Sequence, residues 1–186
     1  IQVTPTSGLT TTEGGGTAAF DVVLTQPPTA NVTIGLSSSD ATEGTVSPAS
    51  LVFTPANWDS AQQVTVTGVP DDVIDGPVGY TIVTTPAVST DATYSGLDPA
   101  DVSVTTTDDD ATTVSITATD PGGSEPGTDD GLFTVRLDGG KLAPPGGITV
   151  NYSVSGMATA GTDYVGLGSS VSIPAGASSA TIPVDV

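Results

Sequence analysis

Apolar and polar residues alternate with a period of two along most of this chain. Stretches such as "FDVVL" at 20–24 and "QVTVT" at 63–67 place an apolar residue at every second position, mostly with polar residues between them. Apolar and β-branched residues with this period are typical of strands that bury one face. No long stretch repeats apolar residues at helical spacing, so we expect an all-β protein.

The alternating segments follow one another at short intervals and are separated by turns rich in Gly, Pro, Asn and Asp. The strands expected from this pattern are 1–5, 17–25, 31–37, 50–55, 62–69, 79–86, 101–108, 112–120, 131–139, 147–156, 169–176 and 179–186. Roughly seven strands make one immunoglobulin-like sandwich. A fresh series begins after the acidic run at 108–110. We therefore predict two tandem immunoglobulin-like antiparallel β-sandwiches, at 1–110 and 111–186.

The two halves resemble each other as divergent copies of one unit. Each has an early glutamate, followed by a Phe-x-Val-x-Leu strand that begins at Phe20 or at Phe133. The second copy has no counterpart of the acidic loop at 71–75 or of the last two strands of the first. We expect the second sandwich to be incomplete at its C-terminus, either because the chain is a fragment or because another chain supplies the strands. Repeats of this kind predict a longer array.

The charge balance excludes several classes of partner. Asp and Glu number 21 against two Lys and Arg, which gives a net charge of −19, and 36% hydrophobic residues set the chain apart from a disordered acidic tail. So negative a chain repels nucleic acid and anionic membrane surfaces. No apolar run is long enough for membrane insertion. Neither Cys nor His is present, which removes thiolate sites and the usual general base, so we expect no enzyme.

Acidic residues gather at positions where strands are expected to end. The candidate ligands found in this way in the first half are Glu13, Asp71, Asp72, Asp75, Asp108, Asp109 and Asp110. Strand ends meet at the poles of a sandwich, and carboxylates that converge there repel one another unless a cation joins them. Ca²⁺ takes six to eight oxygen ligands, mostly carboxylates and carbonyls. We therefore expect Ca²⁺ at the pole next to the domain boundary, where it would stiffen the joint. The alternative is that these residues are solvated turn residues.

Several motifs resemble those of the Calx-β domain family, which includes bacterial extracellular repeats and the regulatory domains of sodium–calcium exchangers. In the second half the resemblance rests on "GMATAGTDY" at 156–164, followed by "IPAG" at 173–176. In the first half it rests on "TTEGG" at 11–15, "DDVIDG" at 71–76 and "TDDD" at 107–110. The resemblance covers nearly the whole chain and implies an immunoglobulin-like sandwich with Ca²⁺ at one pole.

The family's ligand positions can be carried over residue by residue. Its early glutamate falls on Glu13 and Glu125, and the aspartate of its Asp-Tyr pair falls on Asp163. The first half departs from the family at that pair, so the role passes there to Glu43 or Asp40. The family's acidic loop and terminal run fall on Asp71, Asp72, Asp75, Asp108, Asp109 and Asp110. The second half lacks these two groups, so we expect its site to be weak.

These observations favour a non-catalytic, calcium-binding repeat region of a large secreted or cell-surface protein, such as an adhesin, a surface-layer protein or a filament component. Its partners would be neighbouring repeats, and its location extracellular. The alternative is an adhesion module that binds carbohydrate or a protein directly, for which Trp58 could stack on a sugar. A lone tryptophan more often packs over the edge of a sandwich.

Overall fold

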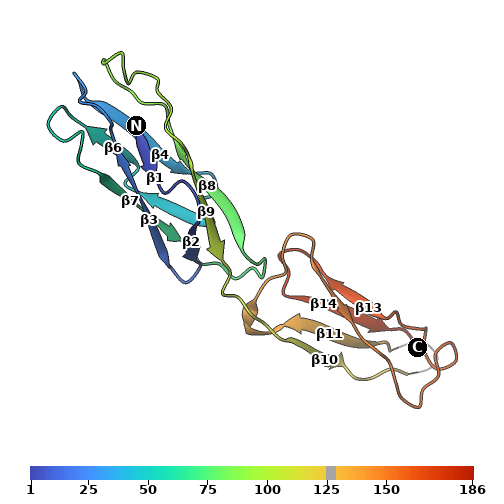
Figure 1. The fold of residues 1–186 in the computed structure, drawn as a ribbon. Helices are drawn as coiled ribbons and strands as arrows, with labels where there is room; N and C mark the ends of the chain where they lie inside the picture. Colours follow the sequence, from blue (N-terminus) through green and yellow to red (C-terminus); the bar gives the residue numbers. More distant parts are fainter. Residues whose placement is uncertain (125–128) are drawn as a thin grey trace. The chain divides into compact units, whose positions relative to one another are not determined.

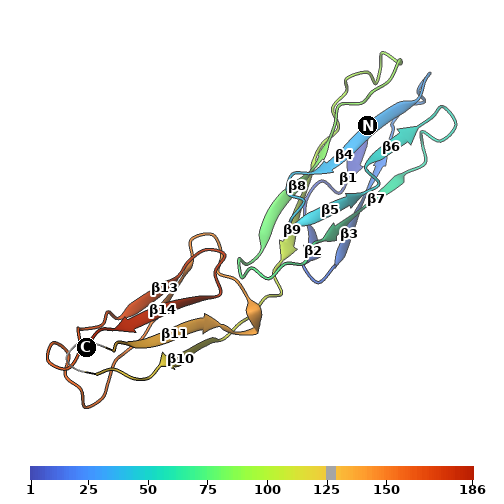
Figure 2. The same cartoon turned by 180° about the vertical axis from the view of Figure 1, so that it is seen from behind.

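The computed structural model describes residues 1–124 and 129–186. The described chain divides into two compact units (Figures 1 and 2), which we call unit 1 (1–71 and 76–109) and unit 2 (72–75 and 110–186). All regular structure within the described residues is β-strand, apart from one 3-10 turn at Asp138–Gly140. The prediction of an all-β, immunoglobulin-like fold is confirmed. None of the described residues forms a helix long and apolar enough to cross a membrane.

Unit 1 is a sandwich of two sheets. The first sheet has the order β1-β3-β7-β5, all antiparallel, and consists of β1 (Gln2–Thr4), β3 (Thr17–Val23), β7 (Gln62–Gly68) and β5 (Gly44–Ser47). The second has the order β2-β9-β8-β4-β6 and consists of β2 (Leu9–Thr12), β9 (Val102–Thr107), β8 (Val78–Thr84), β4 (Val32–Ser38) and β6 (Ser50–Phe53). The sequence pattern predicts one strand before residue 13, at 1–5. The structure has two there, β1 and β2, and β2 lies in the second sheet.

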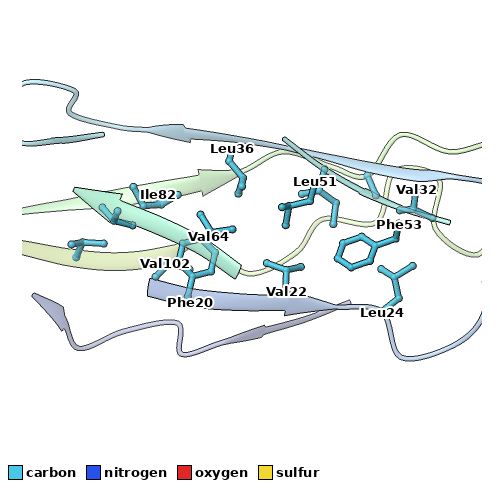
Figure 3. Close-up of a cluster of buried hydrophobic side chains, with 14 of the residues drawn as sticks. Phe20, Val22, Leu24, Val32, Leu36, Leu51, Phe53, Val64, Ile82 and Val102 are labelled. Atoms are coloured by element: carbon cyan, nitrogen blue, oxygen red, sulfur yellow. The ribbon is translucent and has the colours of Figure 1, made fainter. Parts of the chain in front are cut away.

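The core of unit 1 lies between these sheets. Alternation places Phe20 and Val22 inward while Asp21 faces solvent. Figure 3 shows the inward side chains of both sheets packed together, among them Val64 and Ile82. Burying each such side chain stabilises the fold by about 1.5–3 kcal/mol. Trp58 is half-buried and packs against this core, as the packing interpretation of this residue expects.

Unit 2 repeats part of this plan. One sheet has the order β10-β11-β14, and the other pairs β12 with β13. The strands are β10 (Val114–Asp120), β11 (Gly131–Leu137), β12 (Ile148–Asn151), β13 (Ser170–Ile173) and β14 (Ser179–Val184). Its buried cluster is smaller and consists of Val135, Leu137, Ala143, Ile173 and Ile182. Unit 2 also includes the segment 72–75, because the backbone N–H of Leu142 donates to the carbonyl of Asp72 at 2.8 Å.

Candidate metal centre

The site begins with the one parallel pairing of unit 1. Strands β2 and β9 run in the same direction, with Thr12 opposite Thr107. Both strands therefore end at the same edge of the sheet, and the next residues, Glu13 and Asp108, leave it side by side. The backbone N–H of Glu13 donates to the carbonyl of Thr107 at 3.2 Å, which fixes this arrangement. Residues almost one hundred positions apart in the sequence are brought together in this way.

Three carboxylates converge at this strand end. Glu13, Asp108 and Asp110 each offer an oxygen that lies within 4.8 Å of the other two. Glu13 is buried, with 2% of its surface exposed, and the two aspartates are half-buried. Like charges this close repel strongly when little water separates them. We call these three residues the carboxylate group.

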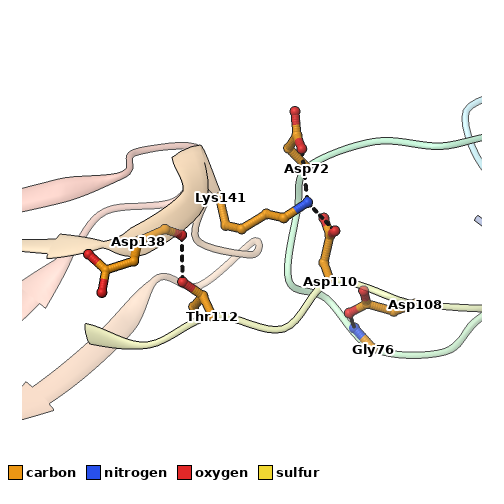
Figure 4. Close-up of polar contacts among 7 residues, drawn as sticks. All are labelled: Asp72, Gly76, Asp108, Asp110, Thr112, Asp138 and Lys141. Atoms are coloured by element: carbon orange, nitrogen blue, oxygen red, sulfur yellow. Dashed lines mark hydrogen bonds and ion pairs between the residues drawn. The ribbon is translucent and has the colours of Figure 1, made fainter. Parts of the chain in front are cut away.

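Asp108 also organises the loop that precedes β8. Its Oδ2 accepts a hydrogen bond of 2.7 Å from the backbone N–H of Gly76 (Figure 4). Gly76 has φ of +75°, a left-handed conformation that glycine adopts without a steric penalty. Asp109 is exposed, and its carboxylate lies close to Gly14, where an added Cβ would come within 3.1 Å of Oδ2.

A buried hydrogen-bond network stands two residues before the carboxylates on the same strands. The hydroxyl of Thr11 on β2 lies 2.8 Å from that of Thr106 on β9 and 3.4 Å from that of Tyr80. The Thr106 hydroxyl donates to the backbone carbonyl of Glu43 at 3.1 Å. These hydroxyls satisfy one another in the interior and hold β2 and β9 together, as buried polar groups require. Sequence reasoning missed them because Thr is an ordinary strand residue.

Glu43 and Asp40, the two candidates in the first half for the aspartate of the family's Asp-Tyr pair, have different surroundings. Glu43 is buried, and it lies outside the carboxylate group. Asp40 uses its carboxylate within its own turn, where Oδ1 accepts from the Thr42 amide at 3.0 Å and from the Thr42 hydroxyl at 2.5 Å. These hydrogen bonds from Thr42 hold the pKa of Asp40 below its usual value.

The acidic loop at 71–75 does not act as one cluster. Asp72 is exposed, and its Oδ1 accepts from the ammonium of Lys141 at 3.0 Å (Figure 4). Lys141 also contacts the Asp110 carboxylate, and these two aspartates raise its pKa above the usual value. Asp110 therefore takes part both in the carboxylate group and in an ion pair. Asp71 is exposed and Asp75 half-buried, and neither belongs to the carboxylate group.

Of the candidates in the second half, the structure describes Asp163, which lies outside the carboxylate group. Asp163 is exposed and closes a local turn, in which its Oδ2 accepts from the Thr159 amide at 2.7 Å. Glu125 lies outside the described residues. Within residues 1–124 and 129–186, the carboxylate group of Glu13, Asp108 and Asp110 is the one cluster with metal-site spacing.

The chemistry of the carboxylate group suits a hard cation. All of its donors are carboxylate oxygens, which Ca²⁺ and Mg²⁺ prefer, whereas Zn²⁺ and Cu²⁺ favour nitrogen or sulfur ligands. Ca²⁺ tolerates irregular geometry and takes further ligands from backbone carbonyls and water. Mg²⁺ demands a near-ideal octahedron and retains its water. The observed residues therefore fit Ca²⁺ in both ligand type and spacing.

Comparison with known proteins gives likenesses of overall fold. No protein-family model and no curated protein matches the chain. The solved structure of CBD12 from CALX1.2 aligns with 99% of this chain and 74% of its own, at 18% identity and a TM-score of 0.45. The calcium binding domain CBD12 of CALX1.1 aligns with 100% of this chain and 75% of its own, at 18% identity and a TM-score of 0.42. The E. coli chaperone DraB aligns with 98% and 85%, at 8% identity and a TM-score of 0.42. At these low scores the likenesses assign no function.

Proposed function

We propose that this chain is a non-catalytic calcium-binding region, in which Glu13, Asp108 and Asp110 hold a Ca²⁺ ion at the end of β2 and β9. The observation that carries this proposal is the convergence of three carboxylate oxygens within 4.8 Å, from segments far apart in the sequence. A divalent ion turns the repulsion among them into attraction. Carbonyls and water would complete the coordination.

Binding at this position would act on the segment that leaves β9. Asp108 and Asp110 both belong to that segment, whereas Glu13 follows β2. An ion held by all three ties the segment to the strand end and reduces its freedom to move. Calcium would thus stiffen the joint between consecutive domains of a repeat array. Such an array fits a Calx-β-like region of a secreted or cell-surface protein, in which neighbouring domains are the partners.

Thermal unfolding of the whole chain in excess Ca²⁺ and in EGTA tests the proposal. A ligand that binds only the folded protein raises the melting temperature by mass action. At this domain size each kcal/mol shifts the midpoint by about 2–8 °C. We expect Ca²⁺ to raise the midpoint of the wild type and Mg²⁺ to have a smaller effect. Equal midpoints in Ca²⁺ and in EGTA would rule out the site.

Two conservative variants locate the ion. Glu13→Gln keeps the size of the side chain but removes its charge, and Asp108→Asn keeps an oxygen that can accept from the Gly76 amide. Both should fold and lose most of the calcium response. Asp98→Asn changes an exposed aspartate that precedes β9, whereas the site follows the other end of that strand; it is the matched control and should respond like the wild type. A full response in Glu13→Gln would place the ion elsewhere.

A further inference from the structure

Each of the five strands described in unit 2 has a counterpart in unit 1. Phe20 on β3 lies opposite Val64 on β7, and Phe133 on β11 lies opposite Ile182 on β14. The hairpins β4–β6 and β12–β13 correspond in the same way, with Val32 opposite Phe53 and Ile148 opposite Ile173. Just beyond these pairs, the amide of Leu36 donates to Ala49 at 2.8 Å, and the amide of Tyr152 donates to Ser169 at 2.9 Å. Unit 1 is therefore an internal template for unit 2.

The template reveals which neighbour is missing beside β12. In unit 1 the free side of β4 is covered by β8, with Leu36 opposite Thr84 and Ser38 opposite Ile82, and β9 follows β8. The residues of unit 2 that correspond to 36–38 are 152–154, directly after β12. Within the described residues the second sheet of unit 2 contains β12 and β13 alone, and no strand pairs with 152–154.

Several side chains of unit 2 are more exposed than their counterparts in unit 1. Phe20 is 1% exposed, whereas Phe133 at the corresponding position is 36% exposed. Ile116 on β10 corresponds to the partly buried Val3 on β1, and it is 55% exposed. Val154 is 49% exposed. These residues lie around a depression of about 290 Å³. We call its apolar lining the open face: Ile116, Phe133, Tyr152, Val154, Leu167 and Ile182.

Unit 1 also indicates the chemistry of the segment that would cover this face. Strand β8 turns Tyr80 and Ile82 inward, and β9 turns Val102 and Val104 inward. The positions between them are mostly uncharged, such as Thr81. The matching occupant is a β-hairpin with an apolar residue at every second position. Since the chain carries a net charge of −19, acidic residues within the paired strands would be repelled, and β8 and β9 themselves contain no charged residue.

We propose that the open face of unit 2 binds a partner β-hairpin of the β8–β9 pattern, whose first strand pairs antiparallel with 152–154. Strand addition to a sheet edge is an established mode of peptide recognition, in which main-chain hydrogen bonds supply affinity and side-chain pockets supply specificity. The hairpin would extend the sheet of β12 and β13 by two strands and cover Phe133 and Ile116. This inference does not depend on calcium binding.

The backbone direction identifies the amide that a partner strand must meet. In unit 1 the amide of Ser39 donates toward β8, to the carbonyl of Thr81 at 2.9 Å, whereas that of Leu36 donates to the other side. Amides of consecutive residues in a strand point to opposite sides. In unit 2 the amide of Tyr152 points toward Ser169, so the amide of Ser153 faces the free edge.

A labelled peptide of residues 78–107, which contains β8 and β9, serves as the probe for the whole chain in EGTA. We expect saturable one-to-one binding and slowed amide hydrogen exchange at 152–155. Ser153→Pro removes the edge-facing amide at an exposed position and should weaken binding at least about tenfold. Ser153→Ala keeps the amide, and this control should bind like the wild type.

Three results would overturn the proposal. The first is a wild type that fails to bind the peptide, and the second is equal binding by Ser153→Pro and Ser153→Ala. The third is a reversible dimer, seen by sedimentation without peptide and abolished by Phe133→Ser, because the face would then bind a second copy of this chain. Circular dichroism of each variant verifies that its β-structure is intact.

Discussion

At the scale of single residues, the carboxylate group depends on side chains that carry no charge. Thr11 and Thr106 join β2 to β9 through a hydroxyl contact of 2.8 Å, and Tyr80 reaches the same network from β8. Each hydroxyl would be costly to bury alone, so the network specifies one arrangement of the strands. Glu13 and Asp108 follow two residues later and inherit their positions from it.

Gly44 is required by the same network. A Cβ at this position would lie 2.0 Å from the Tyr80 hydroxyl, so Gly44→Ala must displace that ring. Overpacking of this kind costs about 1–3 kcal/mol, and we expect a loss of that size in urea unfolding. Gly79→Ala is the control, because its Cβ would meet nothing within 4 Å. Equal stability of the two variants would show that Tyr80 is not held in place.

The sequence predicts the charged residues of the site better than their support. Glu13 and Asp108 stand out in a Thr-rich and Val-rich chain. The repeat comparison selects Glu13, and the acidic run at the end of an expected strand selects Asp108. Thr11 and Thr106 have no such signal, because Thr at alternate strand positions usually faces solvent. The acidic run at 71–75 also stands out in the sequence, but its residues do not belong to the carboxylate group. Its local density of aspartates does not reveal that Asp72 pairs with Lys141.

At the scale of elements, strand positions follow from alternation but strand partners do not. The expected strands at 62–69 and 101–108 match β7 and β9 to within a residue or two. The parallel pairing of β2 with β9 depends on a contact between residues 95 positions apart, which no local pattern encodes. In unit 2 the strand expected at 147–156 ends at Asn151, because it has no partner beyond that residue on its free side.

The connection from β8 to β9 is held by Asp91. Its carboxylate accepts from the Thr29 amide at 2.6 Å and from the Thr93 amide at 2.8 Å, and these bonds lower its pKa to about 2. A folded-state pKa below the unfolded value stabilises the fold at higher pH, and this contribution is lost as the pH falls through the folded-state pKa. Asp91→Ala should therefore be less stable than the wild type at neutral pH.

The stability difference between wild type and Asp91→Ala should shrink as the pH falls from about 4 to about 2. Urea unfolding at a series of pH values measures it. The exposed Asp98, changed to Ala, is the control and should show little difference at any pH. A stability gap between wild type and Asp91→Ala that stays constant down to pH 2 would contradict the role given to this carboxylate.

Lys141 provides a fixed positive charge at Asp72 and Asp110. Lys141→Gln leaves both carboxylates without that charge, so its melting temperature in EGTA should fall below that of the wild type. Excess Ca²⁺ should narrow the gap, because the ion supplies positive charge at Asp110. Arg136→Gln, which removes the other cation, is the control and should show the same small effect with and without Ca²⁺. An equal gap for Lys141→Gln in both buffers would separate Lys141 from the metal site.

At the scale of the whole molecule, a net charge of −19 with two basic side chains opposes compaction unless cations are recruited. The carboxylate group places three negative charges close together at one strand end, where a cation would relieve their repulsion. The open face of unit 2 is a separate, apolar feature. Composition predicts the need for cations, because the net charge is a sum over residues that can be read from the sequence. The open face becomes clear only when the exposure of Phe20 and Phe133 is compared in the folded structure.

Anomalous diffraction from crystals grown in Ca²⁺ shows directly whether the carboxylate group holds the ion. We expect a calcium peak bound by Glu13, Asp108 and Asp110, with carboxylate–metal distances of about 2.3–2.6 Å. Crystals of Glu13→Gln grown in the same way should lack that peak or show it much weakened. A wild-type map without a peak among these three carboxylates, from crystals that scatter well at the same wavelength, would show that they do not bind Ca²⁺.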